Sequence, residues 1–156
     1  MNSLIKTFYT ALSESDLDTL RSCYAENVTF EDPAFGELKG AEVMDMWTFL
    51  LSRGGENLKV QFEIFEESEQ SARGQWIAKY PFGPKKRPVT NVISSHFEIQ
   101  DGKITKHVDH FSLWKWSSQA LGLPGLLMGW SSWFGKKLRT RFRTTLRKTL
   151  QKSSNP

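Results

Sequence analysis

The feature of this sequence that most constrains its fold is a change in the spacing of its apolar residues. From residue 4 the spacing is helical, and after Gly54-Gly55 it becomes an alternation with a period of two. Spacing of three or four residues lines one face of a helix, whereas alternation lines one face of a strand. Helices followed by a run of strands predict an α+β fold, in which the helices cover one face of a mostly antiparallel sheet.

Three helices and five strands are expected. The first helix carries apolar residues at helical spacing from Leu4 to Leu12, the second begins at Ser15-Asp16-Leu17-Asp18, and the third covers residues 40–53 and buries Val43, Trp47 and Leu50. A short strand over residues 28–30 precedes the third helix. The later strands are expected at residues 60–64, 74–80, 89–100 and 103–116, the last two joined by a hairpin at Asp101-Gly102.

The composition fits one folded domain. The chain has 156 residues, of which 38% are hydrophobic, and Cys23 is the only cysteine, so an intrachain disulfide is excluded. No apolar run resembles a signal peptide or a membrane span. We therefore expect a soluble protein of the reducing cytoplasm, with peripheral membrane association as an alternative.

The charges divide the chain into two parts. All 17 acidic residues lie at or before Asp109, where 12 Lys and Arg give a net charge of −5, and the 9 remaining basic residues follow. Residues 119–156 also carry an apolar residue at every fourth position from Trp130 to Leu150. The pattern predicts an α+β domain over residues 1–118 and a basic amphipathic helical extension over residues 119–156, helical from Leu126 to about Leu150.

Three interpretations of the extension remain open. Its apolar stripe can pack on the domain or a dimer mate, and we favour this packing for Leu138, Phe142 and Leu146. Its basic face and aromatic start can instead contact an anionic membrane surface. Nucleic acid is disfavoured because few aromatic residues are interleaved with the basic ones.

Two groups of residues are candidates for acid–base chemistry. Asp32 ends a strand among apolar neighbours, where burial raises a carboxyl pKa. The alternative, which the spacing alone favours, is that Asp32 caps a turn before Pro33. His107 and Asp109 lie two apart on a strand and therefore share a face, where each can tune the other's proton affinity. The alternative is a solvated face or an interface ion pair.

A pocket beside these groups is expected to bind a small apolar or aromatic molecule. Its predicted walls are Tyr9, Trp47, Trp76, Tyr80 and Asn91. The sequence contains no metal-ligand spacing of Cys and His, no phosphate-binding loop and no serine-nucleophile elbow, so no cofactor is expected.

The order of the elements resembles the nuclear transport factor 2-like superfamily, which includes SnoaL-like polyketide cyclases and ketosteroid isomerases. The similar residues are Phe8-Tyr9, Asp16-Leu17, the segment 24–33 that ends in Glu31-Asp32-Pro33, Asp101-Gly102-Lys103-Ile104 and His107-Val108-Asp109. The resemblance implies a cone, in which a curved sheet wraps three helices and leaves a pocket at the wide end. It also implies frequent dimers.

Only some functional residues of these families have a counterpart in this sequence. Asp32 stands where ketosteroid isomerases keep their general base, but Phe8 stands at their oxyanion Tyr, and Ser94 or Ser95 at their oxyanion Asp. The missing donors argue against steroid isomerisation. Asp109 resembles the acid/base Asp of SnoaL-like cyclases.

The sequence thus predicts a pocket protein that is a cofactor-free isomerase, cyclase or hydratase. Asp109 or Asp32 would move the proton, and His107 would tune it. The alternative is a non-catalytic ligand-binding or interaction module, whose basic tail contacts a membrane or a partner. A homodimer through the outer sheet face, near His96 and Glu98, is also predicted, and light scattering at micromolar concentration tests it.

Overall fold

The computed structural model describes residues 3–154 and has the predicted α+β architecture. Helices α1 (Leu4–Glu14) and α2 (Leu17–Cys23) come first, followed by the strands β1 (Tyr24–Asp32) and β2 (Gly36–Lys39) and the helix α3 (Ala41–Gly54). A short 3-10 turn (Gly55–Asn57) then leads into four strands: β3 (Lys59–Glu67), β4 (Ser71–Phe82), β5 (Arg87–Gln100) and β6 (Lys103–His110). The helices α4 (Leu113–Leu121), α5 (Leu123–Met128) and α6 (Ser132–Ser154) complete the chain.

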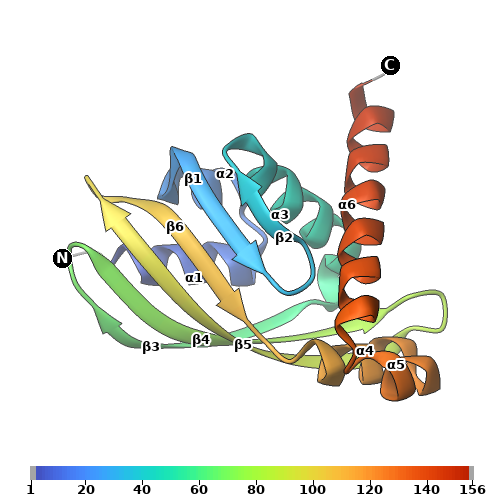
Figure 1. Cartoon of the computed structure of the whole chain (residues 1–156). Coiled ribbons are helices and arrows are strands. Elements are labelled where there is room, and N and C mark those ends of the chain that lie inside the picture. Colours follow the sequence, from blue (N-terminus) through green and yellow to red (C-terminus); the bar gives the residue numbers. More distant parts are fainter. Residues whose placement is uncertain (1–2, 155–156) are drawn as a thin grey trace.

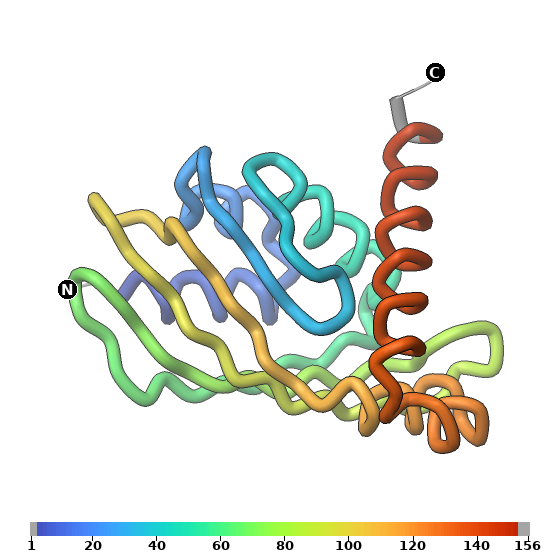
Figure 2. Tube along the Cα trace, viewed as in Figure 1, coloured from blue at the N-terminus to red at the C-terminus, as the bar shows by residue number. Residues whose placement is uncertain are grey.

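The six strands form one curled sheet in the order β2-β1-β6-β5-β4-β3. Only β1 and β6 pair in parallel, and every other neighbouring pair is antiparallel. The helices α1, α2 and α3 lie together on one side of the curled sheet, which gives the cone predicted above (Figure 1). The long strands β4, β5 and β6 extend to the end of the molecule where α4 lies and α6 begins (Figure 2).

The main core fills the space between these helices and the sheet. α1 contributes the completely buried Ile5, Phe8 and Tyr9, and β5 contributes Ile93 and Phe97. Alternate residues of β5 are buried along its whole length, because one face of the strand meets the helices. His96 and Glu98 point to the opposite, exposed face, where the predicted dimer contact stays a prediction.

One glycine allows α1 to approach the sheet closely. A side chain at Gly74 of β4 would place its Cβ atom 2.8 Å from the Glu63 carbonyl oxygen and 3.1 Å from the Tyr9 hydroxyl oxygen. The lack of a side chain at this position therefore makes room for the Tyr9 ring, which stacks on Phe62 at a centroid distance of 5.0 Å.

Two sequence predictions were wrong at element boundaries. The last strand ends at His110 instead of continuing to Trp116, because the Ser112 hydroxyl accepts the backbone N–H of Lys115 and starts α4. The tail is also not one helix from Leu126, since Pro124 lies in the first turn of α5 and a break separates α5 from α6. The strand β2 was not predicted.

The packing predicted for the extension is confirmed. Leu138 and Leu146 of α6 are buried, and Phe142 between them is half-buried and packs with Phe35 and Trp116 at centroid distances of 5.6 Å. A second, smaller core cluster joins Leu138 to Val89 and Trp116 at this end of the sheet. None of the helices within residues 3–154 combines the length and apolar character needed to cross a bilayer.

Candidate active site

A chain of buried hydrogen bonds runs through the interior of the cone. Trp47 Nε1 of α3 donates to the Tyr24 hydroxyl at 3.0 Å, and this hydroxyl lies 2.8 Å from His107 Nδ1. On the other side of the ring, His107 Nε2 lies 2.7 Å from Asp109 Oδ1. Ser95 of β5 donates its hydroxyl to the same carboxylate oxygen at 2.5 Å. All five side chains are buried, so these contacts satisfy polar groups that water does not reach.

The chemistry of the donors gives this chain a direction. An indole N–H can only donate, so Tyr24 accepts from Trp47 and is left to donate its own proton to His107 Nδ1. Burial raises the pKa of Tyr24 well above its ordinary value, which keeps the phenol protonated. The His107 proton then lies on Nε2 and points at Asp109. Among the described residues, no hydrogen bond is formed to the second carboxylate oxygen, Oδ2.

Aromatic rings enclose the His107 ring. Its centroid lies 4.4 Å from that of Phe97, 5.0 Å from that of Phe30 and 5.4 Å from that of Phe8. The side chain has no exposed surface. This packing holds the imidazole in one orientation, with Nε2 toward Asp109.

Asp32 lies beside Asp109 at the ends of two neighbouring strands. In the parallel pair, Glu31 is aligned with Val108, so Asp32 and Asp109 follow side by side and face the same side of the sheet. Asp32 Oδ1 accepts the backbone N–H groups of Ala34 at 2.9 Å and Phe35 at 2.6 Å. The turn-capping role considered for Asp32 is therefore present.

Burial, together with a smaller contribution from the nearby negative charge of Asp109, raises the pKa of Asp32 from 3.8 to about 7. The two backbone N–H donors and the Arg139 charge act in the opposite direction. The side chain is only partly enclosed. Asp32 therefore combines a structural hydrogen-bonding role with a protonation equilibrium near neutral pH.

This shift predicts how stability depends on pH. Because the folded state disfavours the ionised form, the free energy of unfolding should fall as the pH rises from about 4 to about 7, by on the order of 2–4 kcal/mol. Asp32→Asn should remove this fall, and Glu31→Gln, on the exposed side of the same strand, should retain it. Urea unfolding midpoints across this range measure the effect, and equal pH dependence in the wild type and Asp32→Asn would contradict it.

The predicted pocket walls lie around this network. Trp76 of β4 packs near Trp47 with ring centroids 6.0 Å apart, and Asn91 is buried on the neighbouring strand β5. The Tyr80 hydroxyl accepts Trp116 Nε1 at 2.7 Å, and its pKa is raised by burial and by the charge of Asp32. These side chains come from the same interior face of the sheet as Asp109.

Two of these walls carry polar atoms that have no partner. Among the residues described, Trp76 Nε1 is buried without a hydrogen bond. The buried Tyr9 hydroxyl has no partner in hydrogen-bonding geometry, although the nearby Ser95 hydroxyl partly opposes the rise in its pKa. The charge of Asp109 contributes to raising the pKa of Tyr9, although burial is the main cause. An unsatisfied buried donor is costly, so both groups are candidates to bind a polar atom of a ligand.

α6 covers the end of the sheet where Asp32 lies. Arg139 donates to the Pro33 carbonyl oxygen at 3.2 Å, and Arg143 donates to that of Glu37 at 3.0 Å. Both acceptors belong to the β1–β2 region that carries Asp32. The extension thus forms one boundary of the candidate site.

The sequence also matches a known protein family. Residues 5–107 match the SnoaL-like domain. The chain belongs to the SnoaL-like family. The match covers the three helices and the sheet as far as His107 in β6, and the nuclear transport factor 2-like resemblance of the sequence is thereby confirmed. No curated protein matches the sequence of this SnoaL-like chain.

Solved structures show the same fold. A protein of Catenulispora acidiphila with a ketosteroid isomerase-like fold, in complex with trimethylamine, is 18% identical, with a TM-score of 0.65 over 80% of this chain and 96% of the other. An LEH-like epoxide hydrolase from M. tuberculosis is 23% identical, with a TM-score of 0.58 over 80% and 92%. A proposed polyketide cyclase from Xanthomonas campestris is 17% identical, with a TM-score of 0.61 over 75% and 93%. At these identities the likeness establishes the fold of the SnoaL-like protein.

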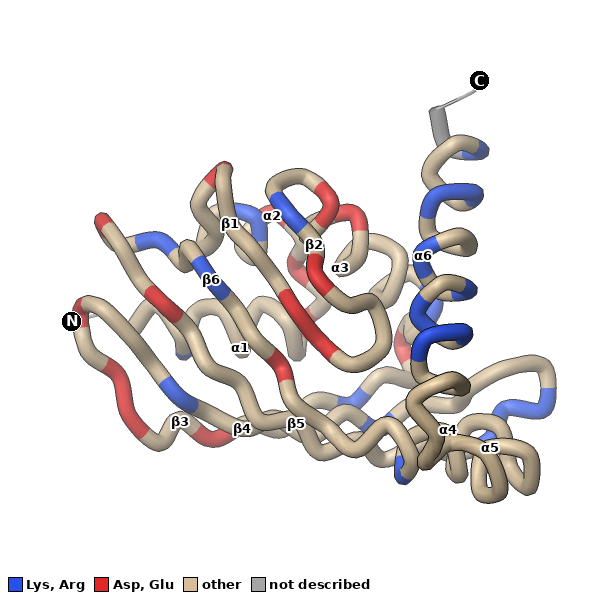
Figure 3. The backbone as a smooth tube through the Cα atoms, viewed as in Figure 1, with Lys and Arg blue, Asp and Glu red and all other residues tan. Residues whose placement is uncertain are grey.

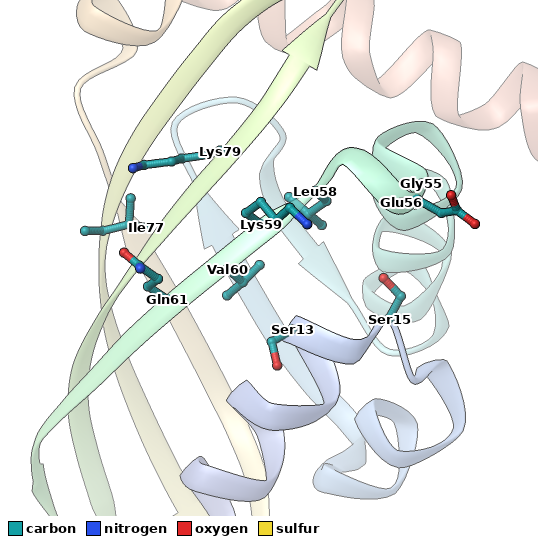
Figure 4. A pocket seen from close by; sticks show the side chains of 10 residues that line it. All are labelled: Ser13, Ser15, Gly55, Glu56, Leu58, Lys59, Val60, Gln61, Ile77 and Lys79. Atoms are coloured by element: carbon teal, nitrogen blue, oxygen red, sulfur yellow. The ribbon is translucent and has the colours of Figure 1, made fainter.

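A separate groove lies on the outside of the SnoaL-like protein. It has a volume of about 610 Å³ and is lined by residues such as Ser13, Glu56, Lys59 and Lys79, from α1, the 3-10 turn, β3 and β4 (Figure 4). None of the predicted site residues lines this groove. Within residues 3–154, no three His, Cys, Asp or Glu side chains converge to hold a metal ion.

Sequence reasoning missed three residues that lie near the two carboxylates. Tyr24, Ser95 and Arg139 contact or influence the two carboxylates, yet none was proposed as a site residue. Ser95 had only a partial signal, because a regular hairpin at Asp101-Gly102 places its neighbour Ser94 opposite Asp109. Tyr24 and Arg139 had none, since their partners lie 83 and 106 residues away.

Proposed function

We propose that this SnoaL-like protein is a cofactor-free acid–base catalyst that acts on a small apolar or aromatic molecule. The observation that carries the proposal is the directed hydrogen-bond chain, which delivers two donors to Asp109 Oδ1 and leaves Oδ2 without one. A carboxylate fixed in this way can accept a proton without reorienting. The names of the structural relatives, an epoxide hydrolase and a proposed polyketide cyclase, are compatible with such chemistry.

The proposed step is proton transfer at a carbon next to a carbonyl group. Asp109 Oδ2 takes the proton as the C–H bond breaks, and the electron pair moves onto the carbonyl oxygen to form an enolate. The Tyr9 hydroxyl and Trp76 Nε1 are the proposed donors to that oxygen. Returning the proton to a different carbon completes an isomerisation. In a cyclisation, the enolate carbon attacks a second carbonyl within the substrate, and the resulting alkoxide takes the proton back from Asp109.

Asp32 and His107 have distinct proposed roles. With a pKa of about 7, Asp32 is available both as an acid and as a base near neutral pH, so it is suited to pass a proton to or from the second reacting atom. His107 and Tyr24 are positioning residues, because each acts on Asp109 through hydrogen bonds. Trp47, Tyr80 and Asn91 are proposed as apolar and polar walls of the ligand site.

Proton exchange into simple ketones tests the proposal. The protein is incubated in D₂O with β-tetralone and related cyclic aryl ketones, and loss of the α-proton signal is followed by NMR. We expect exchange above the buffer rate, reduced about 10²–10⁴-fold in Asp109→Asn. Glu98→Gln, on the outer face of the sheet, is the matched control and should exchange like the wild type.

The same assay separates catalysis from binding alone. The non-catalytic module has its own support, because Asp32 already caps a turn and α6 covers the site. Ketones that raise the melting temperature but never exchange would favour that module. An Asp109→Asn variant that exchanges at the wild-type rate would remove Asp109 from the proposed chemistry.

A further inference from the structure

The short helix α5 exposes its large apolar side chains and packs its glycine against the protein, whereas apolar side chains usually pack inward. A Cβ atom at Gly125 would lie 2.0 Å from the Ser117 carbonyl oxygen, and one at Gly129 would lie 3.0 Å from the Ser117 Cβ atom. The two glycines therefore let α5 pack tightly on α4.

α5 and the residues that follow it expose several large apolar side chains, which we call the α5 patch. Leu127 is 62% exposed and Trp130 is 76% exposed, although such residues are normally buried. A cluster of this kind marks an interaction site. The α5 patch comprises Leu123, Leu126, Leu127, Met128, Trp130 and Trp133.

The tryptophan rings at this surface are held in place. Trp130 Nε1 donates to the Leu127 carbonyl oxygen at 2.8 Å, and Trp114 Nε1 of α4 donates to that of Leu126 at 3.0 Å. Their polar atoms are thus satisfied within the protein, while the rings remain exposed. Amphipathic rings of this type are favoured at the boundary between water and lipid headgroups.

Basic residues lie near the α5 patch, and α4, α5 and α6 contain no acidic residue. Lys137 lies over the Trp133 ring at 4.9 Å, and Lys136 and Lys115 are exposed nearby in sequence. The β4–β5 turn adds Lys85, Lys86 and Arg87, and the Arg87 guanidinium carbon would lie 3.1 Å from a Cβ atom at Gly122, next to α5. No Asp or Glu follows Asp109 in the sequence.

The figures place these features at one end of the molecule. The β4–β5 turn projects beside α4 and α5, at the foot of α6 (Figure 1). Basic positions dominate α6 and that turn, whereas acidic positions lie on the strands and helices of the body (Figure 3). The apolar stripe of α6 itself is occupied by packing on the body, so it does not compete for this role.

We propose that the α5 patch docks this protein onto an anionic lipid surface. Leucine and tryptophan side chains would enter the headgroup boundary, and the lysines and arginine would lie against the lipid phosphates. Charge selects this occupant over a second copy of the chain, because a symmetric contact would bring two identical basic rims together. It is selected over nucleic acid because the centre of the patch consists largely of aliphatic side chains.

Vesicle co-sedimentation tests the proposal on the full chain. One set of vesicles contains phosphatidylcholine alone, and the other contains equal parts of phosphatidylcholine and phosphatidylglycerol. We expect binding to the second set only. Leu127→Gln/Trp130→Gln should weaken it by at least about tenfold, because two inserted side chains are lost. Lys136→Glu/Lys137→Glu should weaken it by at least about twentyfold.

Two control variants test whether the loss of vesicle binding is specific to the α5 patch. Phe65→Gln changes a residue that is 55% exposed outside the α5 patch, and Lys6→Glu/Lys59→Glu reverses two exposed charges elsewhere. Both should bind vesicles like the wild type, and circular dichroism should show that all variants fold.

Three results would overturn the proposal. The first is no binding to phosphatidylglycerol vesicles, or binding that Leu127→Gln/Trp130→Gln leaves intact. The second is a dimer that this double variant converts to a monomer, which would make a second copy the occupant. The third is tight binding to a DNA duplex that depends on Lys136 and Lys137 but not on Leu127 and Trp130.

Discussion

Ending the chain after Ser131, which removes α6, is expected to lower the melting temperature by roughly 10–20 °C. Leu138 and Leu146 are buried by contacts between α6 and the body, and each contributes about 1.5–3 kcal/mol. The entropic cost of ordering the helix offsets part of this gain. The truncation also exposes Phe35, Trp116 and Val89, so binding of the dye ANS should increase.

Point variants keep this prediction testable if the truncated chain does not fold. Leu146→Ala leaves a cavity at a position that is 5% exposed and should lower the free energy of unfolding by about 2–5 kcal/mol. Lys148→Ala, on the exposed side of the same helix, is the control and should change it by less than about 0.5 kcal/mol. Thermal unfolding followed by circular dichroism measures both. A truncated protein with the wild-type melting temperature would show that the packing of α6 adds no stability.

Replacing His107 with Leu is expected to lower the free energy of unfolding by about 3–5 kcal/mol. The change removes a donor from Asp109, which is 3% exposed, and leaves the Tyr24 hydroxyl without an acceptor. A buried polar group that loses its partner carries the full cost of its desolvation. Because this cost arises in the folded protein, urea unfolding at neutral pH measures it directly.

A double-mutant cycle separates this coupling from the loss of packing. Asp109→Leu alone should also be destabilising, because it removes the acceptor of Ser95 and His107. The variant His107→Leu/Asp109→Leu should be less destabilised than the sum of the single variants, since neither buried partner remains unpaired. Additive effects would show that the hydrogen bond between these residues makes no net contribution. His96→Leu, on the exposed face of β5, serves as the control.

Several features of the fold were predictable because they depend on local patterns. The spacing of Ile5, Phe8 and Leu12 specifies one buried helix face, and the alternation along β5 specifies which side chains point inward. Alternation also predicted that His107 and Asp109 share a face of their strand, and that His96 lies opposite the side carrying Phe97 and Ile99. The resemblance to a known superfamily added the cone, which no local pattern gives.

The partners of the catalytic candidates depended on the register of the sheet. A regular hairpin around Asp101-Gly102 pairs Ile99 with Ile104, and continuing that register would set Ser94 opposite Asp109. An irregularity between Glu98 and Ile99 shifts the pairing by one residue, so that Ser95 meets Asp109 instead. Because side chains alternate between faces, this shift turns His107 and Asp109 toward the helices. Their sequence alone does not specify such a shift.

In the C-terminal extension, too, some features follow from the sequence alone and others depend on the tertiary structure. The spacing of Leu138, Phe142 and Leu146 determined by itself that α6 has one apolar face, because a helix brings every third or fourth residue together. Whether that face meets protein or lipid is set by competition between surfaces far apart in the chain, and the body of the protein provides the closer partner. At α5, the glycines pack against α4 and the leucines remain exposed. Close contact between two helices requires the smallest side chains, so the position of α4 in the tertiary structure decides which face of α5 is buried.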